Sequence, residues 1–261
     1  MMDNEDRTFM QVQRNAPNAS SGKPDLSVII PMFNERESLP VLLERLSGVL
    51  ASFPGTYELL INDDDSPDGT RQVTESYRRR CPRLRVIRCV DGEKGPAPAV
   101  VSGWRAARRS VLAVMGADLQ RPPELLVRMI EAFGNASVAL VIVGRHLLNG
   151  QELRWNPIRK WIWRGASNLA QAMLPLQAQH ATNPMSGYFM LRRSVVDGAA
   201  LQPKGCKILL EILGRGRYDK VIEMSYRFGK RHRGSSKPGA GVMRDYPVRW
   251  TWTQLIEPQP A

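Results

Sequence analysis

The feature that most constrains this chain is a series of short apolar runs, each separated from the next by a segment of helical length. Such runs occupy residues 26–31, 57–61, 84–89, 111–115 and 139–143. Helices are predicted between them at about 38–50, 70–80, 97–108 and 123–133. Strands that alternate with helices through short loops are typical of an open, mostly parallel sheet with helices on both faces. The sequence therefore predicts an α/β fold, with ligands bound beyond the carboxyl ends of the strands.

The alternation stops after Arg145. A segment rich in Trp and Arg at 158–174 is predicted to be a helix, and an irregular stretch follows it. A short helix near 209–214, a strand near 221–227 and a very basic loop are expected after that. The expected organisation is a polar, disordered leader at 1–24, a domain at 25–241 and a C-terminal tail at 242–261.

Basic residues outnumber acidic ones, which gives the chain a formal net charge of +12. Such an excess favours an anionic partner: nucleic acid, a phosphorylated substrate or an acidic membrane surface. The charge alone does not choose among the three. The three cysteines have no paired spacing, which argues against a disulfide framework or a zinc site and suits a reducing cytosol.

Neither a membrane-spanning segment nor a secretory signal is expected. The apolar run at 138–143 is far shorter than the roughly 20 residues that cross a bilayer. Residues 1–21 contain no apolar stretch and carry acids at Asp3, Glu5 and Asp6. We therefore expect a cytoplasmic protein whose contact with a membrane is peripheral.

Two acidic motifs follow predicted strands. Residues 63–70 read Asp-Asp-Asp-Ser-Pro-Asp-Gly-Thr, with four carboxylates in six positions. This run is either a solvated acidic turn or a ligand site in which something cationic compensates the charges. The second motif contains Asp118, where a carboxylate after a strand could hold a divalent cation that bridges phosphates. The alternative is that Asp118 caps the helix that follows.

These motifs belong to a longer colinear set. Residues 31–35 read Pro-Met-Phe-Asn-Glu, and residues 117–124 read Ala-Asp-Leu-Gln-Arg-Pro-Pro-Glu. In this order and spacing the chain resembles glycosyltransferase family 2, and within it the dolichyl-phosphate mannosyltransferase and polyprenyl-phosphate glycosyltransferase branch. The resemblance extends over residues 26–237. It includes Gly95, 143–145, Arg159, Arg164, 186–188 and 231–237. Each motif alone is weak, whereas the colinear set is specific.

The resemblance implies a GT-A fold, which is a Rossmann-like nucleotide-sugar domain with a mostly parallel central sheet. It also implies roles for individual residues. The nucleotide-sugar-binding residues would be Pro31, Phe33, Glu35, Asn62, Asp64, Gly116, Ala117 and Lys237. The catalytic residues would be Asp118, Gln120, Arg145 and Arg231, with Asp118 as the ligand of Mg²⁺ or Mn²⁺. The acceptor phosphate would be bound by Arg159, Arg164 and Ser186.

The implied reaction moves a mannose- or glucose-like sugar from a GDP- or UDP-linked donor to a polyprenyl phosphate, such as dolichyl or undecaprenyl phosphate. A metal and arginines suit this chemistry, because negative charge grows on the leaving diphosphate. A lipid phosphate is already an anion at neutral pH, so no catalytic histidine is expected. The implied location is the cytoplasmic membrane face, reached peripherally or through a membrane-embedded partner subunit.

The sequence departs from the family at two acidic positions. Gly116 stands where the family carries the first Asp of an Asp-x-Asp pair, so Asp118 is the one carboxylate left in that pair. Asn183 stands where relatives have an Asp ahead of the dipeptide Ser186-Gly187. These changes motivate an alternative function: a catalytically impaired nucleotide-sugar-binding relative with a regulatory or scaffold role.

Three further interpretations stay open or are set aside. The tryptophans at 155, 161 and 163, interleaved with arginines, suit either core packing or an interfacial helix. The basic loop at 227–237 suits either a solvated face or a lid over diphosphate. A nucleic-acid-binding module would explain the positive charge but leaves the acidic loop at 63–68 without a purpose, so nucleic acid is not expected as a partner.

Overall fold

The computed structural model describes residues 25–88, 95–145, 174, 181, 183–201 and 208–226, without the side chains of Arg88 and Arg145. The strands of this part are β1 (Asp25–Met32), β2 (Thr56–Asp63), β3 (Leu84–Arg88), β4 (Val111–Val114), β5 (Val138–Arg145), β6 (Phe189–Arg192) and β7 (Lys220–Tyr226). The helices are α2 (Ser38–Leu50), α3 (Thr70–Arg78), α4 (Pro96–Ala106), α5 (Leu125–Phe133) and α7 (Ile208–Arg215), with a 3-10 turn, η3 (Arg193–Val195).

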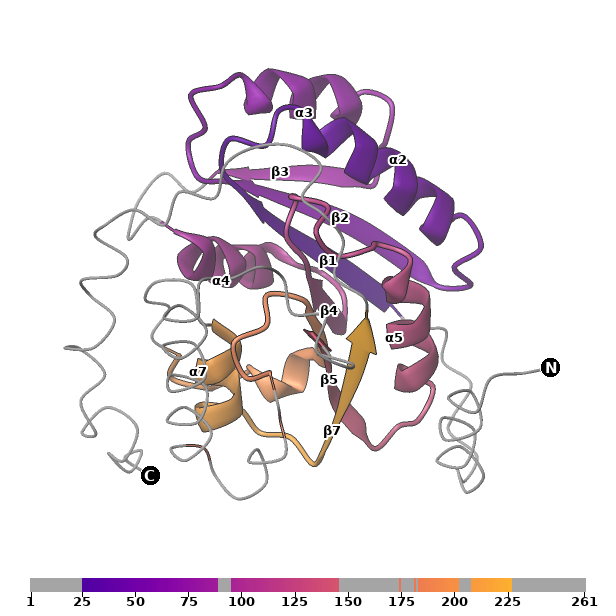
Figure 1. The fold of residues 1–261 in the computed structure, drawn as a ribbon, viewed down its shortest axis with the longest axis vertical. Helices are drawn as coiled ribbons and strands as arrows, with labels where there is room; N and C mark the ends of the chain where they lie inside the picture. Colours follow the sequence, from indigo (N-terminus) through magenta and orange to yellow (C-terminus); the bar gives the residue numbers. More distant parts are fainter. Residues whose placement is uncertain are drawn as a thin grey trace, which may run out of the picture.

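The described strands form a seven-stranded sheet in the order β3-β2-β1-β4-β6-β5-β7 (Figure 1). The pairs β1–β2, β1–β4, β2–β3 and β5–β7 are parallel, whereas β6 is antiparallel to both β4 and β5. The predicted α/β fold with a mostly parallel sheet is therefore confirmed.

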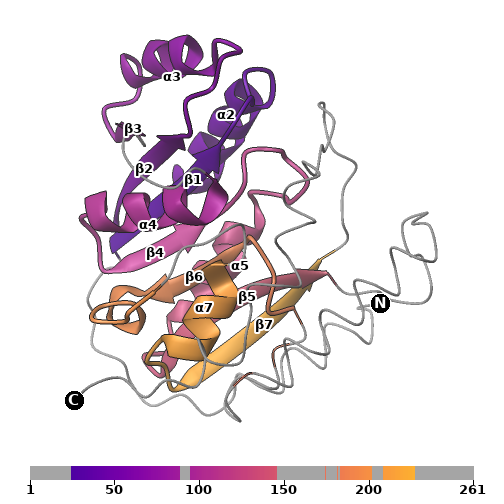
Figure 2. The same cartoon turned by 90° about the vertical axis from the view of Figure 1, so that its left-hand side faces the viewer.

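The alternation of side chains along each strand divides the core into two layers. Val28 and Ile30 of β1 pack in the cluster that contains the apolar faces of α2 and α5. Ile29, between them, packs in a second cluster with α4 and α7. Figure 2 shows α4 and α7 in front of the sheet and α2 behind it. Because both faces are covered, the strands read as continuous apolar runs rather than alternating ones.

Strand β6 is not evident in the sequence, which predicts an irregular stretch at Phe189–Arg192. The strand has four residues, and Phe189, Met190 and Leu191 are all buried between β4 and β5. A strand that is short and buried on both sides shows no period-two pattern, so its local sequence cannot distinguish it from a buried loop. Its position is decided by the two strands that it pairs with.

Helix α2 also begins differently from expectation. Ser38 is of a residue type that is common at helix N-caps, but it is the first helical residue and the preceding Glu37 already has helical backbone angles. The Ser38 hydroxyl instead donates to the carbonyl and the carboxylate of Glu35. The hydroxyl therefore orders the loop between β1 and α2.

Two consecutive arginines, at the end of β6 and the start of η3, anchor helices on opposite faces of the sheet. Arg192 donates to the carbonyl oxygen of Val138 at 2.9 Å, and its guanidinium lies 5.3 Å from the centre of the Phe133 ring at the end of α5. Arg193 donates to the carbonyl oxygens of Ala107 at 2.7 Å and Trp104 at 3.2 Å, at the end of α4. Cations are favourable at helix carboxyl ends, so part of the chain's positive charge is structural.

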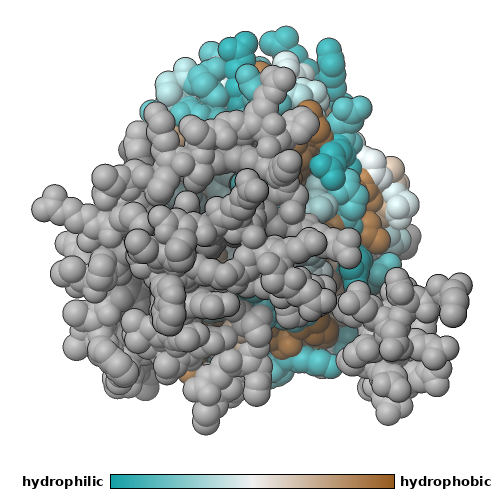
Figure 3. Space-filling view, in the orientation of Figure 1, coloured by the Kyte–Doolittle hydropathy of each residue, from teal (hydrophilic) through white to brown (hydrophobic). Residues whose placement is uncertain are grey.

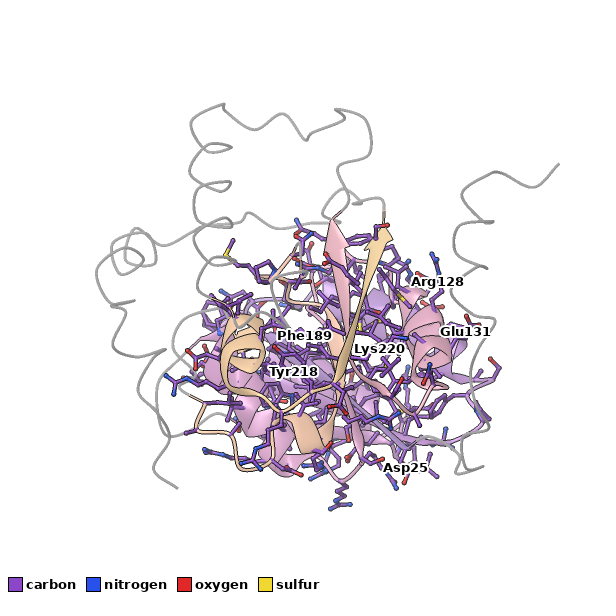
Figure 4. All side chains as sticks on the ribbon, turned by 90° about the horizontal axis from the view of Figure 1, so that it is seen from below. Asp25, Arg128, Glu131, Phe189, Tyr218 and Lys220 are labelled. Carbon is purple, nitrogen blue, oxygen red and sulfur yellow. The ribbon has the colours of Figure 1, made fainter. Side chains whose placement is uncertain are left out.

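A buried carboxylate binds several segments together at the amino ends of the strands. Glu58 of β2 is 5% exposed and accepts hydrogen bonds from the Ser27 hydroxyl at 2.8 Å, Arg85 Nη1 at 2.7 Å and the Arg108 N–H at 2.6 Å. In Figure 4 this end is marked by Asp25, the first residue of β1, opposite the arrowheads of β5 and β7. The network therefore lies away from the carboxyl ends of the strands.

The outer surface over α2 and α3 is mostly hydrophilic, as the upper part of Figure 3 shows. Arg71, Arg78 and Arg79 of this region are exposed. Within the ranges that the structure covers, no helix has both the length and the apolar character needed to cross a bilayer.

Candidate functional site

The arrangement of β1, β2 and β4 determines where a ligand can bind. β1 is parallel to β2 on one side and to β4 on the other, so the connections that follow β1 and β4 leave the sheet in different directions. In open α/β sheets, the crevice outside the carboxyl ends of the strands at such a point is the usual ligand site. The loops at 33–37, 64–69 and 115–124 surround this crevice.

The loop after β1 is held by side chains of the acidic loop. The backbone N–H groups of Asn34 and Glu35 donate to the hydroxyl oxygens of Ser66 at 3.0 Å and Thr70 at 3.1 Å. The Arg36 N–H donates to Asp68 Oδ2 at 3.2 Å. Three successive N–H groups of one loop are thus satisfied by the other, so the two loops form one ordered unit.

Two of the four carboxylates of the acidic loop therefore serve its own structure. Asp63 Oδ1 accepts from the hydroxyl of Ser66 at 2.5 Å and from its N–H at 3.2 Å. Burial raises the pKa of Asp68, but hydrogen bonds from the Thr70 hydroxyl, the Thr70 N–H and the Arg36 N–H outweigh this effect, so the pKa lies below its ordinary value. Asp68 is thus an ionised acceptor for the loop, which supports the turn interpretation for these two residues.

Asp64 lies at a different place, next to helix α4. Its N–H donates to the Met32 carbonyl at 3.1 Å, and its Oδ2 accepts from the Gly95 N–H at 2.8 Å. Gly95 is the N-cap of α4 and has a φ of +130°, a conformation that favours glycine. A carboxylate at a helix N-terminus is electrostatically favourable. Asp64 therefore joins the ends of β1, β2 and α4 at the crevice.

Asp118 is in the loop between β4 and α5. The alternative that Asp118 caps the helix is wrong, because α5 begins at Leu125 with Glu124 at the N-cap. Asp118 Oδ1 accepts from the Gln120 N–H at 3.2 Å, and Leu119 between them has a φ of +55°. Within the described part of the chain, Oδ2 of Asp118 accepts no hydrogen bond. This oxygen is therefore available to a ligand.

Gly116 is half-buried next to Asp118. A Cβ atom placed on Gly116 would lie 3.6 Å from Asp118 Oδ1, an ordinary van der Waals distance. The φ of Gly116 is not in the left-handed region. The backbone would therefore accept an aspartate at 116, and the glycine is not a steric requirement of this loop.

The residues present fit a hard cation held by one protein carboxylate. No group of three or more His, Cys, Asp or Glu side chains gathers in the ranges described. Mg²⁺ does not need such a group, since it commonly takes one or two carboxylates, phosphate oxygens of the substrate, and water. Asp118 supplies one such oxygen at the crevice.

The residues predicted to bind the nucleotide lie in unequal environments. Phe33 is 54% exposed, an unusual exposure for a large aromatic side chain, and Pro31 is half-buried. Ala117 is 2% exposed and has only its backbone to offer. Asn62 is completely buried, with its amide oxygen facing Gly103 of α4. In this arrangement the Asn62 amide does not reach a ligand, and its contribution to nucleotide binding stays a prediction.

A cavity of ≈ 120 Å³ opens beside the acidic loop, between α3 and the end of β3. Asp65, Arg71 and Glu75 line its polar side, and Val86 and Ile87 line its apolar side. The cavity therefore lies on the β3 side of the acidic loop and offers both charge signs and an apolar surface.

On the other side of the crevice, Ser186 fastens a loop to β5. Its hydroxyl donates to the Val143 carbonyl at 2.7 Å and accepts from the Tyr188 N–H at 3.1 Å. Val143 in turn donates its N–H to the Tyr188 carbonyl at 2.9 Å. The predicted contact of Ser186 with the acceptor phosphate stays a prediction, and the hydroxyl already has a structural role.

A cluster that the sequence analysis did not identify lies near the end of β5. Asn183 Nδ2 donates to Glu223 Oε1 of β7 at 3.3 Å. A Cβ atom on Gly144 would lie 2.2 Å from Glu223 Oε1 and 2.8 Å from Asn183 Nδ2, so a larger residue here would displace these two side chains. Gly144 precedes Arg145, whose backbone therefore leaves β5 beside a carboxylate. The sequence signals were Asn183, which stands where relatives have an Asp, and a glutamate in the middle of an apolar strand.

Several predicted site residues are outside the described part. They are Arg159, Arg164, Arg231 and Lys237, together with the side chain of Arg145. The tryptophan-rich segment, the basic loop, and the boundaries predicted for the leader and the tail also lie there. Their predicted roles stay predictions.

Comparison with known proteins supplies the family. The sequence model described as glycosyl transferase family 2 matches residues 27–198. A dolichol-phosphate mannosyltransferase of Pyrococcus furiosus is 42% identical over 221 residues, which cover 85% of this chain and 61% of that protein. One from Mycosarcoma maydis is 32% identical, covering 87% and 78%. An undecaprenyl-phosphate mannosyltransferase of Micrococcus luteus is 30% identical, covering 85% and 91%. This chain thus spans less than two thirds of the length of the Pyrococcus protein.

A solved structure confirms the fold at lower identity. Glucosyl-3-phosphoglycerate synthase from Mycobacterium tuberculosis, crystallised with Mn²⁺, UDP-glucose and phosphoglyceric acid, superposes with a TM-score of 0.62. The match covers 81% of this chain and 73% of that one, at 16% identity. The predicted GT-A architecture is therefore confirmed.

Proposed function

The chain belongs to glycosyl transferase family 2, and from this membership we propose that it transfers a sugar from a nucleoside-diphosphate sugar to a polyprenyl phosphate. The names of the relatives from Pyrococcus, Mycosarcoma and Micrococcus support this acceptor class and favour mannose as the sugar. The observation that carries the proposal is Asp118, whose Oδ2 has no hydrogen bond within the described residues, at the crevice beyond β1 and β4.

The nucleotide-sugar donor would lie along the loops at 33–37 and 64–69, which hydrogen bonds hold together. Phe33 offers an exposed ring for the base, and Asp64 offers a carboxylate at the N-terminus of α4. Asp118 would hold Mg²⁺ or Mn²⁺, which supplies positive charge to the diphosphate oxygens when bound. Gln120, whose N–H orients Asp118, would lie near the sugar. Because hydrogen bonds already order these two loops, Phe33 and Asp64 need not be repositioned during the reaction.

The acceptor would approach from the side of Ser186 and Arg145. A phosphate monoester is anionic at neutral pH, so its oxygen attacks the anomeric carbon without a general base while the diphosphate leaves. The protein's task is then to hold two anions close together, which requires cations. Arg145, Arg159 and Arg164 are the predicted ones. The acceptor is a lipid, so we place the active protein at the cytoplasmic membrane face, a location that sedimentation with anionic vesicles tests.

Calorimetric titration with GDP and then UDP, with and without Mg²⁺, tests the donor site first. We expect one nucleotide to bind at least about tenfold more tightly with Mg²⁺, because the cation joins Asp118 to the diphosphate. The preferred nucleotide identifies the base, and transfer to a short-chain polyprenyl phosphate then measures the reaction. Absence of binding by both nucleotides would contradict the proposal.

A second candidate function is a nucleotide-sugar-binding relative without turnover, favoured by the single carboxylate at Asp118. Gly116→Asp separates the two, since the loop has room for the added side chain. If the chain is an enzyme, we expect the wild-type protein to transfer sugar. The variant should then need a roughly tenfold lower Mg²⁺ concentration, because a second carboxylate binds the cation. The control is Gly48→Asp, which adds the same charge where a Cβ meets nothing within 4 Å. Transfer by Gly116→Asp but not by wild type would establish the second function.

A further inference from the structure

Arg121 lies three residues after Asp118 in the same loop, and no predicted role was assigned to it. Its Nε atom is buried and has no hydrogen-bond partner within the described residues. Its terminal nitrogens, Nη1 and Nη2, each lie 3.9 Å from the point where a Cβ of Gly187 would stand. The guanidinium group therefore reaches from the Asp118 loop across to the loop that Ser186 fastens to β5.

Glu124, the next acidic residue after Arg121 in the chain, does not neutralise it. Glu124 accepts two hydrogen bonds from Arg45, from Nε at 2.9 Å and from Nη2 at 2.6 Å. In the described ranges, Arg121 forms no ion pair and donates no hydrogen bond. The positive charge at this point of the crevice is therefore uncompensated by the residues that surround it in the structure.

The phenol of Tyr188 next to Arg121 does not supply a negative charge either. Tyr188 is completely buried, and its hydroxyl has no hydrogen-bond partner within the described residues. Burial raises the pKa of Tyr188 far above its ordinary value, and the Glu124 charge raises it further, although Arg121 opposes the change. The phenol thus stays neutral and adds no negative charge that could pair with Arg121.

The buried Nε of Arg121 leaves one donor of the guanidinium group without an acceptor, which is unfavourable. The cost is offset when an anion binds, and the two terminal nitrogens form a planar fork that matches two phosphate oxygens. Nη1 and Nη2 are not among the buried, unpartnered polar atoms, so the fork is open to a ligand. Gly187 leaves the space in front of the fork free of side-chain atoms.

We propose that Arg121 is a substrate-binding residue whose guanidinium group contacts a phosphate of the substrates, between Asp118 and Gly187. The inference rests on the proposed function, because it takes its anion from that reaction. The donor diphosphate and the acceptor phosphate present the same chemistry to the fork. Arg121 thereby adds a cation to a loop that carries Asp118 as its one carboxylate at the crevice.

The test compares two probes in Mg²⁺ buffer: the preferred nucleoside diphosphate and a water-soluble, short-chain isoprenyl phosphate. We expect Arg121→Gln to weaken the binding of at least one probe roughly 10- to 100-fold, the scale of a lost charge-assisted hydrogen bond. Arg121→Lys should recover part of that loss, since the charge returns without the fork. Binding of the nucleoside without phosphates should not change.

Arg128→Gln is the matched control, because it removes the same charge from an exposed position on α5 (Figure 4). Weakening of the diphosphate alone assigns Arg121 to the donor, weakening of the isoprenyl phosphate alone assigns it to the acceptor, and weakening of both places it between them. Wild-type affinity of Arg121→Gln for both probes would overturn this inference and leave the proposed function intact. Equal weakening of the nucleoside would also overturn it, as a structural effect. Failure of the wild type to bind either probe would overturn both.

Discussion

Asp118→Asn is expected to reduce sugar transfer by roughly 100- to 1000-fold, the range seen when a group that stabilises transition-state charge is removed. The substitution keeps the shape of the side chain and the acceptor for the Gln120 N–H. It removes the charge that would hold a divalent cation against the diphosphate. We therefore expect the loss mainly in kcat, together with loss of the Mg²⁺ dependence of nucleotide binding, and measure both by steady-state kinetics and calorimetry.

The control for Asp118→Asn is Asp197→Asn, which removes the same charge from an exposed residue after η3. It should leave kcat, KM and metal dependence unchanged. If Asp118→Asn retained transfer within about threefold of wild type, Asp118 would not be the catalytic metal ligand. If both variants lost activity equally, the general charge of the protein would explain the result.

Glu58→Gln is expected to lower the free energy of unfolding by about 2–3 kcal/mol near neutral pH, the second large effect. Glu58 is 5% exposed, and its carboxylate accepts from Ser27, Arg85 and the Arg108 N–H. The amide of a glutamine has an NH₂ group in place of one carboxylate oxygen, so this group would face a hydrogen-bond donor instead of accepting from it. The half-buried Arg85 would also lose its ion pair. Urea unfolding measures the change, with the exposed Glu131→Gln on α5 as the matched control (Figure 4).

The pH dependence of this effect follows from the pKa of Glu58. Burial raises the pKa of Glu58, but the hydrogen bonds from the Arg108 N–H, Arg85 and Ser27, together with the Arg85 charge, outweigh this effect, so the pKa lies below its ordinary value. Because the folded pKa is depressed, the stabilisation is fully present above the unfolded value and is lost as pH falls through the folded value. The difference between wild type and Glu58→Gln should therefore shrink in acid. A difference that stays constant through this range would contradict the assignment.

The loops that surround the crevice were predictable because they depend on local patterns. Apolar runs of strand length and segments of helical length are recognisable within a window of a few residues, and motifs at strand ends are located by the strands. In a parallel sheet those ends share one edge, so the sequence alone was enough to predict that Phe33, Asp64 and Asp118 lie at the same edge.

Charged residues, by contrast, look alike in sequence and differ in the fold. Asp63 and Asp68 hold a loop, whereas Asp118 keeps an oxygen available at the crevice. Arg193 donates to the carbonyl of Trp104, 89 positions away in the chain, whereas Arg121 has no such partner in the described ranges. Burial and pairing are properties of contacts between distant segments, and local sequence does not specify them.

The sequence by itself therefore determined the α/β class and the family, and it predicted the edge of the sheet where the site residues lie. Only the tertiary structure decided the antiparallel placement of β6, the close approach of Glu223 and Asn183 to Gly144, and the open fork of Arg121. The physical reason is the range of the interactions. Periodicity and turn formation act over a few residues, whereas close packing and charge pairing depend on which segments the completed fold places side by side.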